Sequence, residues 1–222
     1  MYLVLFDVDG TLIDSQHMIA AAMARAFAAR GLPAPSRAET LGIVGLSLDV
    51  AMSRLIGRAE ADDEVRALSA AYKEAFFDLR TTAEQQEPLY PGAREALDAL
   101  SARDDVLLGL ATGKSMRGVR AILDLHDLHG RFATLQTADG NPSKPHPGMI
   151  HVALAETGVA PEKAVIIGDT TYDVEMAGAA GIAAIGVGWG YHAASALTRA
   201  GALRVLDRYD ELLPTLDHLF DW

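Results

Sequence analysis

Three observations predict an α/β fold: a doubly wound, Rossmann-like parallel sheet core with an inserted α-helical cap domain. Short runs rich in valine, isoleucine and leucine recur along the chain of 222 residues. Helical segments separate these runs, as in parallel sheets that carry helices on both faces. One long interval, residues 7–105, shows helical patterns and no convincing β run.

Six short apolar runs are predicted to form the strands of the sheet. In chain order they are Tyr2–Phe6, Val106–Ala111, Phe132–Thr137, Ala164–Ile167, Ile182–Val187 and Leu203–Leu206. Helices are predicted between and after them, at Gly92–Ala102, Met116–Leu125, Met149–Thr157, Tyr172–Ala180 and Leu212–Phe220. Strands that alternate with helices in this way are typical of a doubly wound core.

The long interval is predicted to be a helical insertion over residues 15–86. Apolar residues recur with a spacing near 3.6 in three segments, Ser15–Arg30, Leu48–Ile56 and Asp62–Arg80, with glycines and prolines between them. We therefore expect a core of residues 1–14 plus 87–222 and a cap of residues 15–86. The alternative is that these helices pack directly on the sheet.

Composition narrows the classes of function. The chain has no cysteine, so disulfides, thiolate metal sites and cysteine nucleophiles are excluded. A formal net charge of -11 opposes binding to nucleic acid. No apolar stretch is long enough to span a membrane, and the apolar start of the chain is too short for a secretory signal. We expect a soluble, cytoplasmic protein with no membrane partner.

Two carboxylates stand where the first predicted strand ends. Asp7 and Asp9 are two residues apart, so both can face one cleft in an extended segment, and Gly10 then allows a turn. Without a cation the two charges would repel each other, and one carboxylate would take up a proton. A metal-bound nucleophile beside an acid/base partner fits this pair. The alternative is an acidic turn that caps a helix at Asp14 or Ser15.

A second acidic pair follows the fourth predicted strand. Asp169 and Asp173 are four residues apart and share one face if the intervening turn is helical. Carboxylate oxygens of this kind suit Mg²⁺. Asp169 is equally suited to cap the following helix, but the pair Asp7 and Asp9 on another strand favours metal binding.

Donors for a phosphoryl group lie between the acidic pairs. Thr112 and Gly113 end the second predicted strand, and Lys144 precedes a helix. A hydroxyl, a backbone amide and an ammonium group can stabilise the charge on phosphoryl oxygens. All these elements lie on the carboxyl side of the predicted sheet, where open α/β folds bind their ligands.

At these residues the chain resembles the haloacid dehalogenase-like phosphohydrolase superfamily, in the branch that carries a helical cap after the first strand and includes phosphoglycolate phosphatases. Four motifs match in order, and they are Asp7-Val8-Asp9-Gly10-Thr11, Thr112, Lys144, and Gly168-Asp169 with Asp173. The resemblance covers nearly the whole chain and specifies the superfamily far better than the substrate. Because Asp9 is present, it also disfavours dehalogenation.

The resemblance implies a mechanism and a substrate class. Asp7 would attack phosphorus, and Asp9 would protonate the leaving group and later accept a proton from water. Thr112 and Lys144 would hold the phosphoryl group. Mg²⁺ would bind to Asp7, the backbone carbonyl of Asp9, Asp169 and Asp173, the last through water or as a support for Lys144. We expect a small phosphorylated metabolite as the substrate, with 2-phosphoglycolate the best single guess.

Rival functions remain open on these residues. A sugar phosphomutase would pass the phosphoryl group to a second substrate instead of to water. A phospho-acceptor that binds a partner would use similar residues, although such receiver domains carry their aspartate on the third strand and are shorter. The run Gly109–Ser115 is one residue too short for a nucleotide-binding P-loop, and Gly186–Tyr191 lacks the third glycine of a dinucleotide-binding motif.

Overall fold

A computed structural model describes residues 1–81 and 87–222. Six parallel strands form one sheet in the order β3-β2-β1-β4-β5-β6. Their bounds are Tyr2–Phe6 (β1), Val106–Thr112 (β2), Phe132–Thr137 (β3), Ala164–Gly168 (β4), Ala183–Val187 (β5) and Arg204–Leu206 (β6). The predicted doubly wound α/β fold is therefore confirmed, and each predicted strand is present within about one residue.

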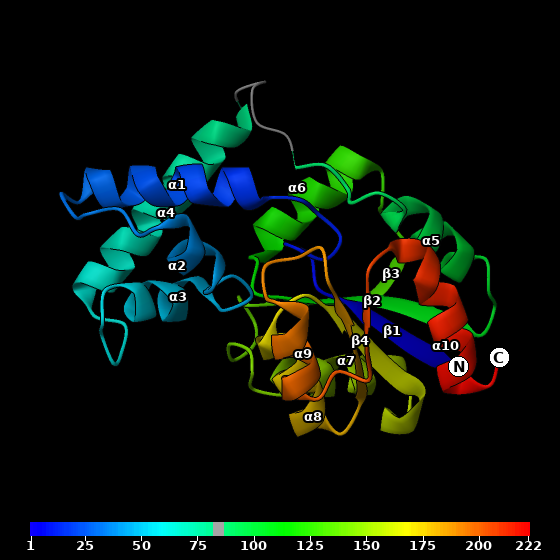
Figure 1. Cartoon of the computed structure of the whole chain (residues 1–222). Coiled ribbons are helices and arrows are strands. Elements are labelled where there is room, and N and C mark those ends of the chain that lie inside the picture. The colour runs from blue at the N-terminus through cyan, green and yellow to red at the C-terminus, as the bar shows by residue number, and fades with distance from the viewer. Residues whose placement is uncertain (82–86) are drawn as a thin grey trace.

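Helices cover the sheet on both faces (Figure 1). One face carries α5 (Ala93–Ser101), α6 (Met116–His126) and α10 (Leu212–Phe220). The other carries α7 (Gly148–Thr157), α8 (Thr171–Ala180) and α9 (Ala194–Ala200). Alternate residues of β1 point to opposite faces, so that Val4 and Phe6 pack in one cluster and Leu3 and Leu5 in the other. Two apolar layers thus fix the central strand.

Four helices lie beside the sheet, at one end of the molecule (Figure 1). They are α1 (Gln16–Ala29), α2 (Arg37–Leu41), α3 (Leu48–Leu55) and α4 (Asp63–Thr81). Their buried side chains, including Met23, Phe27, Met52 and Leu68, form a cluster separate from the two sheet clusters. We call residues 15–81 the cap. The expected end of the cap at residues 82–86 lies outside the described residues, and the division into 1–14 plus 87–222 and 15–86 stays a prediction.

Two helices were not predicted from the sequence. The short α2 begins at a capping box, in which Ser36 accepts from the Glu39 amide and Glu39 accepts from the Ser36 amide. This signal is visible in the sequence and could have located the helix. For α9 the N-terminal signal is missing, because its N-cap residue Ala193 has no side-chain acceptor. No described helix has both the length and the apolar character needed to cross a membrane.

Candidate active site

The strand order brings the predicted site residues to one edge of the sheet. Strand β1 lies between β2 and β4, so the residues that follow their carboxyl ends are neighbours. Asp7 follows β1, Thr112 ends β2, and Asp169 follows β4. Strand order reverses at β1, which is where ligands bind in open α/β sheets.

Three buried carboxylates form the centre of the site. Asp7, Asp169 and Asp173 each offer an oxygen within 4.8 Å of the other two. Lys144 inserts its ammonium group among them, with Nζ 2.8 Å from Asp7 Oδ1 and 2.6 Å from Asp173 Oδ1. Three negative charges therefore face one positive charge in a place that solvent hardly reaches.

The pKa values of this cluster reflect burial first. Burial raises the pKa of Asp7 to about 6, against the opposing effect of Lys144. Burial also raises the pKa of Asp169 well above its usual range, and the charges of Asp7 and Asp173 add to the effect. Burial by itself lowers the pKa of Lys144, but the two carboxylates outweigh it and raise the pKa above its ordinary value. Lys144 therefore stays a cation, and Asp7 and Asp169 keep their protons to a higher pH than a free aspartate does.

Asp169 is oriented by its neighbours and does not cap a helix. Its carboxylate accepts from the hydroxyl of Thr11 at 3.0 Å and from the amide of Tyr191 at 2.9 Å. Thr170 is the N-cap of α8, and it forms a capping box with Asp173. The alternative in which Asp169 serves as an N-cap is therefore wrong. Asp173 has two roles, because Oδ2 closes the capping box while Oδ1 binds Lys144.

Two glycines allow the backbone to close around Asp169. A Cβ atom at Gly10 would lie 2.3 Å from its carboxylate, and one at Gly190 would lie 2.1 Å from its Cβ. Gly10 also has a φ of +90°, which a residue with a side chain rarely adopts. Gly190 and Tyr191 therefore belong to this site, and the segment Gly186–Tyr191 opens no helix, since α9 begins at Ala194.

Asp9 lies outside the group of three carboxylates and has its own partners. Its carboxylate accepts from the Ser15 hydroxyl at 2.6 Å and from Lys114 Nζ at 2.8 and 3.1 Å. Burial alone lowers the pKa of Lys114, but the charges of Asp9 and Glu87 raise it above its ordinary value. Ser15 heads α1 without a side-chain capping bond. The alternative of an acidic turn that caps this helix therefore has no support here.

Thr112 and Gly113 lie where the core meets the cap. Thr112 is buried, and its hydroxyl accepts from the Lys114 amide at 3.2 Å. A Cβ atom at Gly113 would lie 2.5 Å from the carbonyl oxygen of Gly45 and 2.6 Å from that of Leu46. The backbone of the loop after β2 therefore directly contacts the backbone of the turn between α2 and α3.

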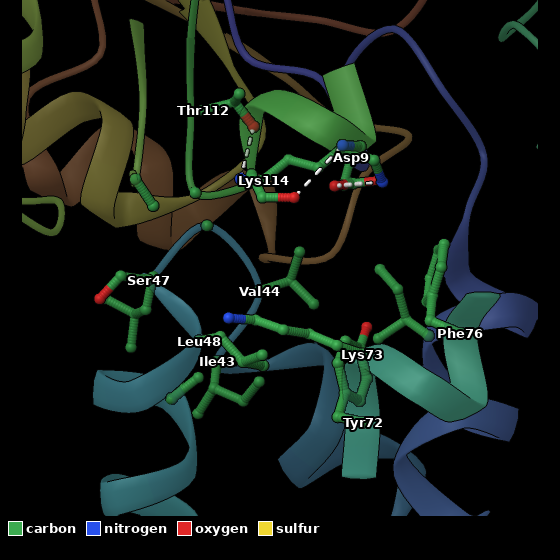
Figure 2. A pocket seen from close by; sticks show the side chains of 18 of the residues that line it. Asp9, Ile43, Val44, Ser47, Leu48, Tyr72, Lys73, Phe76, Thr112 and Lys114 are labelled. Atoms are coloured by element: carbon green, nitrogen blue, oxygen red, sulfur yellow. Dashed lines mark hydrogen bonds and ion pairs between the residues drawn. The ribbon is translucent and has the colours of Figure 1, made fainter. Parts of the chain in front are cut away.

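A cavity of about 370 Å³ separates core and cap. Figure 2 shows Asp9, Thr112 and Lys114 on the core side. The cap side contributes mostly apolar side chains, among them Ile43, Val44, Leu48, Tyr72 and Phe76, and also the cationic side chain of Lys73. Asp7 and Lys144 are not among its lining residues, and both are about 1% exposed. The structure thus places the cavity beside Asp9 and leaves Asp7 covered.

The carboxylate cluster fits a hard divalent cation. Its three carboxylates, those of Asp7, Asp169 and Asp173, surround the ammonium group of Lys144, so acidic groups are in excess. Oxygen ligands with an excess of negative charge suit Mg²⁺ or a similar ion. Two histidines that are near each other in the sequence, His126 and His129, do not belong to the cluster. His126 contacts the Glu87 carbonyl and His129 contacts Asp124.

Comparison with known proteins agrees with this architecture. Residues 4–187 match the family model described as haloacid dehalogenase-like hydrolase. The chain belongs to this family. Among curated relatives, "Probable phosphatase IndB" of Dickeya dadantii is 33% identical over 95% of this chain and 91% of its own length. A phosphoglycolate phosphatase of Salmonella typhimurium is 29% identical over 96% of this chain and 91% of its own length.

Solved structures of the family share the whole architecture. A hydrolase of Pseudomonas syringae has a TM-score of 0.86 at 26% identity, and the match covers 98% of this chain and 99% of that one. A Bacteroides vulgatus protein assigned as a beta-phosphoglucomutase has a TM-score of 0.82 at 24% identity, over 100% and 91% of the two chains. The second likeness concerns the fold alone. The chain is thus a haloacid dehalogenase-like hydrolase with both the sheet and the cap region represented in its relatives.

The structure gives contacts to residues for which the sequence analysis had no role in the site. Thr11, Ser15 and Tyr191 contact the acidic groups directly, and Lys114 binds Asp9. Lys114 follows Gly113 in the sequence, so the sequence indicates that Lys114 lies near the site. It does not indicate that Lys114 binds Asp9, because that depends on the conformation of the side chain.

Proposed function

We propose that this hydrolase is a Mg²⁺-dependent phosphatase that cleaves a small phosphomonoester through an aspartyl phosphate on Asp7. One observation carries the proposal: Asp7 is buried with Oδ1 held by Lys144 and with Oδ2 free of hydrogen bonds among the described residues. An oxygen in this state is held in place and is available to attack phosphorus.

The proposed reaction consists of two displacements at phosphorus, and each site residue has a role in one or both. In the first, Asp7 Oδ2 forms a bond to phosphorus, the bond from phosphorus to the ester oxygen breaks, and protonated Asp9 gives its proton to that oxygen. In the second, water attacks the aspartyl phosphate, Asp9 takes up the proton, and Asp7 is released with inorganic phosphate. Thr112, the Gly113 amide and Lys144 hold the phosphoryl oxygens throughout.

A divalent cation has a defined place in this scheme. Asp7, Asp169 and Asp173, with the backbone carbonyl of Asp9, would hold it. When bound, it offsets the repulsion between the carboxylate nucleophile and the phosphate dianion. Thr11 and the Tyr191 amide would keep Asp169 oriented for this purpose.

The substrate is proposed from two kinds of support. The phosphoglycolate phosphatases among the relatives make 2-phosphoglycolate the first candidate. The apolar cap wall indicates that larger, less polar leaving groups also fit the cavity. A substrate panel should therefore include 2-phosphoglycolate, sugar phosphates and esters with apolar leaving groups.

Phosphate release tests the proposal. The protein is assayed with p-nitrophenyl phosphate and the panel, in Mg²⁺ and in excess chelator, beside Asp7→Asn. We expect release in Mg²⁺, none in chelator, and none by Asp7→Asn. Transfer between sugar positions with little free phosphate would instead indicate a mutase. A panel on which the wild-type protein releases nothing would refute the hydrolytic function.

A further inference from the structure

Lys114 is a buried cation that the proposed chemistry does not yet use. It follows Gly113 in the loop after β2, and its side chain is 9% exposed. Nζ contacts both oxygens of Asp9, at 2.8 and 3.1 Å (Figure 2). It also lies 3.3 Å from Glu87 Oε1. The ammonium group is therefore bound to the carboxylate that is proposed to move protons.

The surroundings of Lys114 fix where its ammonium group lies. Its aliphatic chain passes over Gly118 of α6, where a Cβ atom would lie 2.8 Å from Lys114 Cγ. The Phe76 ring of α4 lies 5.0 Å from Nζ. A glycine inside a helix is less favourable than alanine, and here it leaves the space that this side chain occupies.

A second carboxylate, that of Glu87, also binds the ammonium group of Lys114. Glu87 is 2% exposed and also accepts from Arg80 Nε at 2.7 Å. Arg80 belongs to α4 of the cap, Lys114 and Asp9 line the cavity from the sheet side, and Glu87 precedes α5. Charges of alternating sign thus run from the cap to Asp9.

We propose that Lys114 is a positioning residue for Asp9, and that Glu87 in turn fixes Lys114. This inference rests on the proposed phosphatase function. Ser15 donates a hydrogen bond to Asp9 Oδ1 only, and Lys114 donates one to Oδ2. Without Lys114 the carboxylate would therefore lose its hydrogen bond at Oδ2. Displacement of a catalytic group by about 1 Å can cost about a hundredfold in rate.

The dependence of rate on the leaving group separates positioning of Asp9 from other roles. An alkoxide must be protonated as it leaves, whereas 2,4-dinitrophenolate is stable without a proton. The experiment measures single-turnover ester cleavage, with enzyme in excess, for an alkyl ester that the wild-type protein hydrolyses and for 2,4-dinitrophenyl phosphate. This isolates the first displacement, in which Asp9 acts as the acid.

For Lys114→Met we expect about a hundredfold slower cleavage of the alkyl ester and less than about a threefold change for the dinitrophenyl ester. Lys114→Arg should restore part of the alkyl ester rate, because it returns a cation. Lys163→Met serves as the matched control, since Lys163 is exposed before β4 and should leave both rates unchanged.

Gly118→Ala provides a second variant if Lys114→Met folds poorly. It keeps the charge, favours the helix and crowds the Lys114 chain, so we expect the same bias toward loss on the alkyl ester. Equal losses on both esters, or no loss on the alkyl ester, would overturn the inference while the phosphatase function stands. A wild-type protein that cleaves neither ester would refute the proposed function itself.

Discussion

At the residue scale, the two oxygens of Asp7 have different surroundings. Lys144 holds Oδ1, while Oδ2 is buried without a partner among the described residues. Burial raises the pKa of this carboxyl group to about 6. Such a group is costly to the fold when it is charged, and that cost is a measurable sign of a site built for chemistry.

Asp7→Asn should stabilise the metal-free protein at neutral pH while it abolishes turnover. Asp7 releases its proton near pH 3.8 in the unfolded chain and near pH 6 in the folded one, so the folded state loses stability as pH rises through this interval. In chelator we expect the variant to exceed the wild-type free energy of unfolding by a few kcal/mol at pH 7. The difference should shrink toward pH 4, where Asp7 is protonated.

Denaturant unfolding of both proteins at several pH values, in chelator, measures this difference. Other titrating groups are shared by the two proteins and cancel in the comparison. A wild-type protein that is more stable than Asp7→Asn at pH 7 would show that Lys144 more than offsets the burial of Asp7.

At the element scale, strand order explains why the sequence was informative. Apolar runs ending in Asp7, Thr112 and Asp169 locate three strand ends, and a parallel sheet places such ends at one edge. Side-chain partners follow from no such rule. Asp9 turns to Lys114 because Gly118 of α6 leaves room, and Asp173 reaches Lys144 because Thr170 starts α8 where it does.

Helices that begin at a local capping motif can also be predicted from the sequence, whereas helices that lack such a motif cannot. The capping box at Ser36 and Glu39 marks α2 in the sequence. By contrast, the N-cap residue of α9 is Ala193, which makes no side-chain capping bond. The helix is held by the burial of Leu197 against the sheet, which is a tertiary contact. The fold could therefore be predicted almost completely, whereas the contacts around Asp9 needed coordinates.

Gly113→Ala tests the contact between the loop after β2 and the cap. The new Cβ atom would meet the carbonyl oxygens of Gly45 and Leu46 and should push the cap turn outward. We expect KM to rise about tenfold, equivalent to about 1.4 kcal/mol, together with a loss of folding stability, because backbone atoms must shift. Steady-state kinetics and thermal unfolding measure the two effects.

Gly178→Ala is the matched control for that variant. Gly178 lies on α8, and a Cβ atom there meets nothing within 4 Å. Its KM should equal the wild-type value. An unchanged KM in Gly113→Ala would mean that the cap turn tolerates displacement and does not shape substrate binding.

At the scale of the whole molecule, cap and core enclose a cavity that reaches Asp9 but leaves Asp7 covered. A phosphate ester can reach Asp7 only if the cap or the loops around the site move. Closure of a cap over a site of this kind excludes bulk solvent and completes the set of contacts. The structure is thus that of a closed or nearly closed enzyme.

Cation binding should stabilise the whole fold. A ligand that binds only the folded state at a hundred times its Kd adds about 2.7 kcal/mol, which is about 5–10 °C in Tm for a chain of this size. We expect Mg²⁺ to raise Tm of the wild-type protein by this amount. Asp169→Asn should lose most of the increase.

Asp221→Asn is the control for a general effect of removing one acid. Asp221 is exposed near the C-terminus, and its φ of 54° is also tolerated by asparagine. This variant should keep the full Mg²⁺ response. An equal response in Asp169→Asn would place the cation elsewhere.

We expect Asp7 to become covalently phosphorylated during turnover. The direct measurement uses Asp9→Asn with 2,4-dinitrophenyl phosphate and Mg²⁺, because the first displacement then needs no acid while the second lacks its base. After an acid quench and proteolysis, mass spectrometry should find one phosphoryl group on Asp7, labile to hydroxylamine. A burst of dinitrophenolate without a phosphorylated peptide, or with the phosphoryl group on another residue, would contradict the account.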